Sequence, residues 1–95
     1  MALYNNETVS VITPVYNVAK VIERTLDSML MQDYKDLEIV LVDDCSKDNS
    51  AEIIKRYKKL YPNIVYHKQE KNGGAAVARN TALNIAKGRY VAFLD

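Results

Sequence analysis

Four short apolar runs, separated by stretches with helical periodicity, constrain the fold of this chain more than any other feature. The runs are rich in β-branched residues, as strands are, and cover residues 9–13, 38–42, 64–67 and 90–94. Strands that alternate with helices favour a parallel sheet joined by right-handed crossovers. We therefore predict an α/β fold, a three-layer αβα sandwich around a Rossmann-like parallel sheet with the strand order 3-2-1-4.

The stretches between the runs carry the end signals of helices. Asn17 is a good N-cap for a first helix that begins at Val18, and Asp48 or Ser50 is suited to cap the second. Pro62 ends the second helix because proline cannot continue one. The predicted buried faces are Val18, Val21, Ile22, Leu26, Met29 and Leu30, then Ile53, Ile54, Tyr57, Leu60 and Tyr61, then Ala75, Ala78, Ala82, Ile85 and Ala86, with Gly88 at the C′ position of the third helix.

Composition and charge exclude several classes of function. The 95 residues carry a formal net charge of +1, so we expect no broad basic surface for nucleic acid. Cys45 is the only cysteine, which rules out an intrachain disulfide and suits a reducing compartment. The first residues lack the basic start and apolar run of a signal peptide, and no apolar stretch approaches the roughly 20 residues of a membrane span. We therefore expect a cytoplasmic protein.

Unusual residues gather where the predicted strands end. Pro14 to Asn17 follow the first strand, Asp43 to Ser46 the second, Lys71 to Gly74 the third, and Asp95 the fourth. In open α/β sheets, ligands bind in the crevice beyond the carboxyl ends of the strands, at the point where the strand order reverses. Strands one and four flank that point here. These residues therefore predict a single site built from four loops.

The glycine pattern excludes two common nucleotide sites. A dinucleotide fold needs G-x-G-x-x-G directly after the first strand, and a P-loop needs G-x-x-x-x-G-K-[ST]. The three glycines of this chain are at positions 73, 74 and 88, and none follows the first strand. A ligand at this edge must be held in another way.

The residues at the strand ends suit a nucleotide. Tyr16 offers a ring on which a base can stack, although it could merely pack beside the turn. A carboxylate of Asp43 or Asp44 could accept an N–H from a base or hydroxyls from a ribose, or could only cap a helix.

The third and fourth strand ends add weaker signals. Residues 72–74 let the backbone approach an anion just before a helix N-terminus, or form a plain tight turn. Arg79 could meet a phosphate or form a surface salt bridge. Asp95 could hold a ribose hydroxyl, help to seat a metal, or only cap.

Three stretches, SVITPVYN, EIVLVDDCSKDNS and EKNGGAAVARNTALNIAKGRYVAFLD, resemble glycosyltransferase family 2 in both order and spacing. The resemblance covers nearly the whole chain after residue 8. It implies the N-terminal half of a GT-A fold, so that residues 1–95 would be the truncated nucleotide-sugar-binding portion of a longer glycosyltransferase domain. A strand that ends one residue before the chain stops also indicates a fragment.

The resemblance implies a role for each matching position. Asp44 would bond the base, and Asp95 would be the first acid of an aspartate-rich motif whose metal-binding acid comes later, which makes Asp95 a weak metal candidate. No catalytic residue would lie within this chain. The implied donor-binding set is Pro14, Val15, Tyr16, Asp43, Asp44, Asn72, Gly73, Gly74, Arg79, Asn80 and Asp95.

The implied reaction is in-line displacement of a nucleoside diphosphate from a sugar by an acceptor hydroxyl, with inversion. A UDP-sugar would be the donor, a hexosyl group would be transferred, and a glycan or lipid-linked acceptor would receive it, in polysaccharide or glycan synthesis. The full-length enzyme would need a divalent metal, Mn²⁺ or Mg²⁺, and could work at the inner face of a membrane. Cys45 departs from the family's usual glycine, so that turn could need a different backbone angle, and Ala19 stands where many relatives carry an acid.

A phospho-receiver signalling domain is an alternative interpretation of the same residues. Such a domain would also place acids after strands, with Asp43 and Asp44 holding Mg²⁺ and Asp95 taking phosphate. It would leave P-V-Y-N and N-G-G unexplained.

We also expect the isolated chain to be inactive and to self-associate through residues 90–94, because an apolar strand at a sheet edge is a template for pairing.

Overall fold

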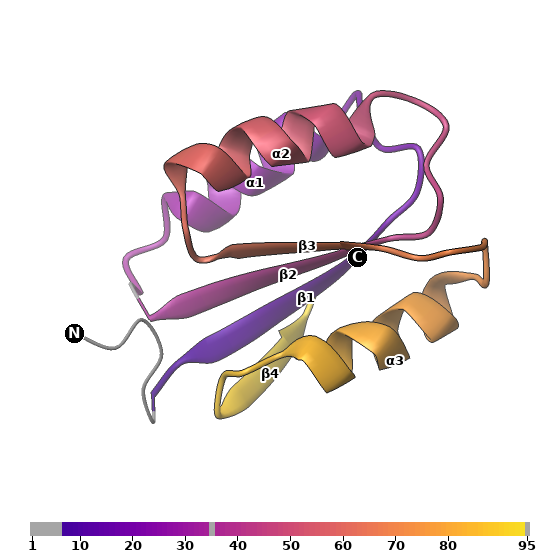
Figure 1. Ribbon diagram of the computed structural model, residues 1–95. Coiled ribbons are helices and arrows are strands. Elements are labelled where there is room, and N and C mark those ends of the chain that lie inside the picture. Colours follow the sequence, from indigo (N-terminus) through magenta and orange to yellow (C-terminus); the bar gives the residue numbers. More distant parts are fainter. Residues whose placement is uncertain (1–6, 35, 95) are drawn as a thin grey trace.

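The computed structural model describes residues 7–34 and 36–94. Within them, strands and helices alternate along the chain (Figure 1). The strands form one parallel sheet in the order β3-β2-β1-β4, which confirms the predicted order and direction. The elements are β1 (Val9–Val15), α1 (Ile22–Leu30), β2 (Leu37–Asp43), α2 (Ser50–Leu60), β3 (Ile64–Lys68), α3 (Ala75–Ile85) and β4 (Tyr90–Phe93).

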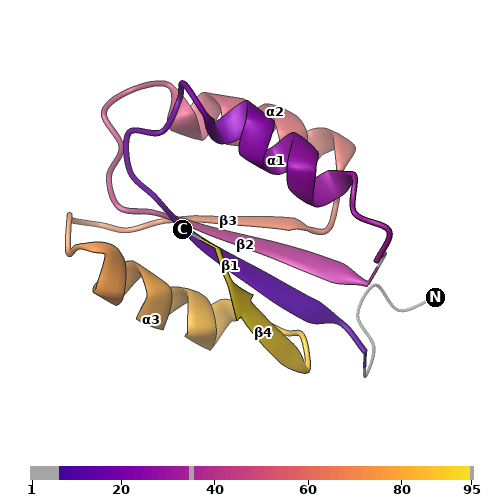
Figure 2. The ribbon, with the colours of Figure 1, turned by 180° about the vertical axis from the view of Figure 1, so that it is seen from behind.

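The helices lie on both faces of the sheet, as Figures 1 and 2 show from opposite sides. Helices α1 and α2 cover one face and α3 covers the other, so the predicted three layers are confirmed. Strand β2 is buried between them because its apolar residues alternate between the two faces. Ile39 and Leu41 join the cluster under α1 and α2, whereas Val40 and Val42 join the cluster under α3.

Hydrogen bonds join the turn between α3 and β4 to the N-terminal ends of β1 and β2. Glu38 is buried, and its Oε1 accepts hydrogen bonds from Ser10 Oγ at 2.6 Å and from the Lys87 N–H at 2.8 Å. Ser10 Oγ in turn accepts the Gly88 N–H at 2.8 Å. Position 88 needs glycine for space, since a Cβ there would lie 2.7 Å from the Thr8 carbonyl oxygen. The predicted C′ role was wrong, because Gly74 is the glycine with positive φ in the described chain.

The first helix begins later than predicted. Helix α1 starts at Ile22, after a turn through residues 18–21. Asn17 does not cap it, because Asn17 has a left-handed φ of 51° and its side chain accepts a hydrogen bond from the Lys47 N–H. The second helix begins at Ser50 with Asn49 at the N-cap position, although Asp48 does accept the Ser50 N–H.

Burial was overestimated at two places. Leu60 and Tyr61, predicted to lie on the buried face of the second helix, are exposed at its last turn. The predicted buried strand at residues 90–94 is exposed along β4, where Phe93 is 54% accessible. Strand β4 pairs on one side with β1, and no described helix packs over it as α1 and α2 pack over β2 and β3.

The two helices on the same face are joined by polar contacts on their outer sides. Tyr57 of α2 donates a hydrogen bond to Asp27 of α1 at 2.7 Å, and Arg56 pairs with Glu23 at 3.1 Å. The bond to Asp27 is the largest of the effects that raise the pKa of Tyr57 to about 12.

Across residues 7–34 and 36–94, no helix is long and apolar enough to cross a membrane.

Candidate functional site

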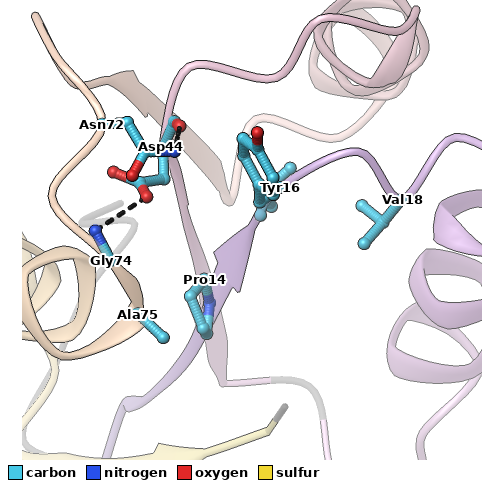
Figure 3. Close-up of a pocket in the computed structure, with 8 residues that line it drawn as sticks. Pro14, Tyr16, Val18, Asp44, Asn72, Gly74 and Ala75 are labelled. Atoms are coloured by element: carbon cyan, nitrogen blue, oxygen red, sulfur yellow. Dashed lines mark hydrogen bonds between the residues drawn. The ribbon is translucent and has the colours of Figure 1, made fainter.

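A cavity of about 370 Å³ opens where β1 and β2 end and α3 begins (Figure 3). Three separate loops contribute to its wall, as the four-loop prediction anticipated for the first three strand ends. A ring, a carboxylate and a glycine turn therefore face one space. The lining residues are Pro14, Val15, Tyr16, Val18, Asp44, Asn72, Gly74 and Ala75.

Asp44 connects the end of β2 to the turn before α3. Its side-chain oxygens accept the N–H groups of Gly73 at 2.8 Å and Gly74 at 2.9 Å, and its carbonyl accepts from Asn72 Nδ2 at 3.2 Å. Its own N–H donates to the Val15 carbonyl at 2.8 Å. Asp44 is thus 5% exposed yet still faces the cavity. Because each carboxylate oxygen has further acceptor capacity, a ligand N–H or O–H could still bind to it.

The turn before α3 requires glycine at one position. Gly74 has φ 91°, a left-handed conformation that side chains rarely adopt, and it directly precedes the first residue of α3. Its carbonyl accepts the Ala78 N–H at 3.1 Å, the first bond of the helix. The backbone can therefore turn sharply beside the cavity, and the N-terminus of α3, which favours anions, lies at the cavity wall.

The other wall comes from the end of β1. Pro14 lies within the strand, at a position paired with Val42. Alternate residues of β1 pair to opposite sides, since the Val15 carbonyl binds the chain after β2 and the Ile12 carbonyl accepts the Leu94 N–H. The backbone nitrogen of Pro14, which carries no hydrogen, therefore lies on the β4 side of β1. It is just beyond the last residues of β1 that pair with β4. Tyr16 follows, 46% exposed, with its ring at the rim of the cavity (Figure 3).

The structure places Asp43 behind the cavity and not in its wall. Its Oδ1 accepts the Ser46 N–H at 2.8 Å and its Oδ2 accepts the Tyr66 hydroxyl at 2.6 Å. Asp43 is fully buried, and both oxygens are used to hold its own loop and β3. Burial, followed by this hydrogen bond, raises the pKa of Tyr66. The geometry therefore indicates a structural part for Asp43.

Cys45 stands where glycosyltransferase family 2, which the sequence resembles, usually has glycine. It has a backbone angle that glycine adopts readily. Its φ is 69°, in the left-handed region, so the turn has not changed its angle to suit the side chain. The thiol is half-buried and donates to the Gln69 carbonyl at 3.3 Å. Cys45 does not line the cavity.

The remaining predicted residues are spread over neighbouring surfaces. Gly73 lines a second cavity, on the β3 side of the turn. Arg79 is half-buried and Asn80 exposed on α3, and neither lines the first cavity. Asp95 lies outside the described residues. In the described part of the chain, no group of three or more His, Cys, Asp or Glu side chains could hold a metal ion.

Two lining residues were missed by the sequence analysis. Val18 and Ala75 were both assigned to buried helix faces, but Val18 lies in the turn before α1, and Ala75 is exposed at the start of α3. An apolar residue in the first turn of a predicted helix that follows a strand end is a usable signal for such positions.

The sequence and the structure can be compared with known proteins. Residues 10–95 match glycosyl transferase family 2. The chain is 52% identical over 87 residues to a Bacillus subtilis protein, TuaG, whose name assigns it to teichuronic acid biosynthesis as a glycosyltransferase. The match covers 92% of this chain and 34% of that protein. The chain therefore spans about a third of this curated relative's length.

Solved structures agree in fold. The crystal structure of Staphylococcus aureus TarS residues 1–349 in complex with UDP matches with a TM-score of 0.86 and 38% identity, over 93% of this chain and 27% of that one. The mannosyltransferase PcManGT of Pyrobaculum calidifontis, in complex with GDP-mannose and Mn²⁺, matches with a TM-score of 0.79 and 35% identity, over 90% and 26% of the two chains.

Proposed function

Because this chain belongs to glycosyl transferase family 2, we propose that its cavity binds the nucleotide of a UDP-sugar. We propose further that a longer protein containing residues 1–95 as its nucleotide-binding part transfers a hexosyl group, with inversion, to a glycan or lipid-linked acceptor. The observation that carries the proposal is the convergence of Tyr16, Asp44 and the N-terminus of α3 on one cavity. That the longer protein works in the cytoplasm beside a membrane stays a prediction.

Each part of the cavity suits one part of a nucleotide. A base stacked on Tyr16 would gain about 1–3 kcal/mol, judged from bases stacked on aromatic side chains elsewhere. Asp44 is buried but retains acceptor capacity towards the cavity, which suits the N–H of a pyrimidine. The backbone around Gly74 and the N-terminus of α3 favour the negative charge of a diphosphate. Asn72, Pro14 and Val15 shape the walls of the cavity.

The predicted donor-binding residues that do not line this cavity have different proposed roles. Arg79 and Asn80 remain proposed contacts for the phosphates, from α3. Gly73 contributes by donating its N–H to Asp44. Asp43 supports the site from behind, through Ser46 and Tyr66.

The chemistry of transfer requires groups that the described residues do not combine. Inverting transfer needs a base to deprotonate the acceptor hydroxyl. Asp44 is the carboxylate that lines the cavity, and its two side-chain oxygens already accept the N–H groups of Gly73 and Gly74 and are proposed to bind the nucleotide. We therefore propose that this chain alone binds the donor nucleotide and transfers no sugar. Metal-dependent transfer or donor hydrolysis by the purified chain would contradict this.

A divalent metal is proposed for the longer enzyme. One structural relative was solved with Mn²⁺. Among the described residues no group of three or more His, Cys, Asp or Glu side chains could hold a metal ion, and Asp95 stays a predicted contributor. The phospho-receiver alternative is not favoured, because the chain belongs to another family and both oxygens of Asp43 bind inside the fold.

The test is calorimetric titration of the 95-residue chain with UDP. Tyr16 is half exposed, so its substitution should leave the fold intact. Tyr16→Phe should retain affinity, whereas Tyr16→Ala should lower it about 5- to 150-fold, which corresponds to roughly 1–3 kcal/mol of stacking. Asp44→Ala should cost about 1–3 kcal/mol of binding for the unpaired polar partner.

The matched control is Asp33→Ala, which removes an exposed acid between α1 and β2 at the opposite edge of the sheet. It should bind UDP as the parent does. Equal UDP affinity in the parent and in Tyr16→Ala, with circular dichroism showing that both chains are folded, would contradict the proposal that the base binds in this cavity.

A further inference from the structure

The loop after β1 forms one wall of the cavity, and its apolar contacts with the core come from two half-buried residues, Val18 and Ala19. Tyr16 is 46% exposed, Asn17 is exposed, and Val18 is only half-buried. Loops with so few buried contacts open at a low cost in free energy unless polar contacts hold them. The position of this wall therefore depends on hydrogen bonds as well as on these apolar contacts.

Side chains from the loop after β2 and from Ser50, the first residue of α2, supply those hydrogen bonds. Three consecutive backbone N–H groups of the first loop each donate to a different side chain of this segment. Backbone donors at such a turn would otherwise be left to water. The bonds run from Asn17 to Ser46 Oγ at 3.0 Å, from Val18 to Ser50 Oγ at 3.0 Å, and from Ala19 to Asp48 Oδ2 at 3.1 Å.

Asp48 is at the centre of this set of contacts. Its Oδ2 binds Ala19, while its Oδ1 accepts both the N–H of Ser50 at 2.9 Å and the hydroxyl of Ser50 at 2.6 Å. The Ser50 hydroxyl, fixed as a donor to Asp48, presents a lone pair to the Val18 N–H. One carboxylate thus holds Ala19 directly and Val18 through Ser50. The same bond from the Ser50 hydroxyl is the main cause of a lowered pKa for Asp48.

Asn17 joins the two loops in the opposite direction. Its Oδ1 accepts the Lys47 N–H at 2.7 Å, and its φ of 51° is left-handed, which asparagine tolerates better than most residues. The contacts with the second loop therefore begin at the residue that directly follows Tyr16.

We propose that Asp48 is a positioning residue for the nucleotide site, which holds Tyr16 and Val18 in the cavity wall by joining the two loops. It does not line the cavity and would not touch the ligand. A wall that is already ordered avoids an ordering cost on binding, so the joined loops raise nucleotide affinity. This inference rests on the proposed function only for the identity of the ligand.

The first test needs no ligand. Amide hydrogen exchange, followed by NMR on the 95-residue chain, should show exchange of Val18 and Ala19 accelerated more than tenfold in Asp48→Ala. The amide of Ile12 in β1 should exchange as in the parent. Asp48→Asn keeps one acceptor oxygen, so its exchange rates at Val18 and Ala19 should lie between those of the parent and those of Asp48→Ala. Unchanged exchange at Val18 and Ala19 in Asp48→Ala would overturn the proposal.

The second test separates positioning from general stability. Asp48→Ala should bind UDP about 5- to 30-fold more weakly, since ordering the backbone of one residue costs about 1–2 kcal/mol. The control, Tyr57→Phe, also removes one hydrogen bond between neighbouring segments, but between α1 and α2. It should lower the unfolding midpoint without changing UDP affinity.

Equal UDP affinity in Asp48→Ala and the parent, or a loss shared by Tyr57→Phe, would contradict the positioning role. If the parent bound no UDP, the proposed function would fail instead. The exchange measurement would then still decide whether Asp48 holds this wall.

Discussion

Replacing Gly88 by alanine should destabilise the fold by about 3–4 kcal/mol. A Cβ at this position would lie 2.6 Å from Ser10 Oγ, 2.7 Å from the Thr8 carbonyl oxygen and 2.8 Å from the Ser10 nitrogen. Two of these atoms are backbone at the start of β1, where Val9 pairs with both β2 and β4. The neighbours therefore cannot move aside without disturbing two strand pairs.

The magnitude follows from two contributions. Overpacking of a well-packed site costs typically about 1–3 kcal/mol, and the rigid backbone on one side puts this case near the upper end. Moving residue 88 also breaks its hydrogen bond to Ser10, worth about 1 kcal/mol. With a urea m-value of about 1–2 kcal/mol/M for a small protein, the unfolding midpoint should fall by roughly 2 M.

Urea unfolding followed by circular dichroism measures the effect, and Gly73→Ala is the matched control. A Cβ on Gly73 would meet the exposed side chain of Val77 at 3.1 Å, which can give way, so the cost should stay below about 1 kcal/mol. Adding Ser10→Ala to Gly88→Ala should recover little, because the backbone contacts remain. Equal midpoints for the two glycine variants would refute the steric reasoning.

Two other outcomes are expected. The bond from Tyr57 to Asp27 stabilises the fold only while the phenol keeps its proton: its contribution is complete below the unfolded pKa of about 10 and is lost as the pH rises through about 12. The difference in urea midpoint between the parent and Tyr57→Phe should therefore shrink from pH 9 to pH 12, and a constant difference would disagree. The exposed apolar strand at residues 90–94 should make the isolated chain self-associate at micromolar concentration, as seen by light scattering. Phe93→Lys should reduce this association, and a parent that is already monomeric would count against it.

The strand order and the layers could be predicted because each rests on a pattern with one dominant cause. Residues 38–42 form a continuous apolar run, and such a run is stable as a strand only when both faces are covered. The small residues Ala78 and Ala82 let α3 approach the sheet closely, and both are buried. Burial of apolar surface decided these features, and it is visible in residue types.

The errors occur where polar contacts override local preference. Asn17 is a residue type that favours the N-cap position, but its backbone is left-handed. Its side chain accepts a hydrogen bond from the N–H of Lys47, 30 positions along the chain. Gly88 has the position of a helix C-cap, but it is small because β1 passes beside it. Neither long-range partner can be identified from the neighbouring sequence, so helix ends and glycine roles were assigned from local rules.

The candidate site was predicted in outline for the same reason. Parallel strands bring their carboxyl ends to one edge, so Tyr16, Asp44 and Gly74 had to come near one another. The difference between adjacent acids could not be predicted, because it depends on which face of β2 each one takes. Asp43 faces Tyr66 on the α1 and α2 side, whereas Asp44 meets the turn before α3.

The loop after β2 organises the loops on both sides of it. Asp44 binds the turn before α3, and Asp48 binds the loop after β1. Both lie in the loop that follows β2, which has more buried residues than the other described strands. Substitutions in this one loop should therefore alter both walls together, whereas a substitution confined to the turn at Gly74 should alter only one. Exchange rates of the Gly74 and Ala19 amides, compared across such variants, would show whether the two walls respond independently.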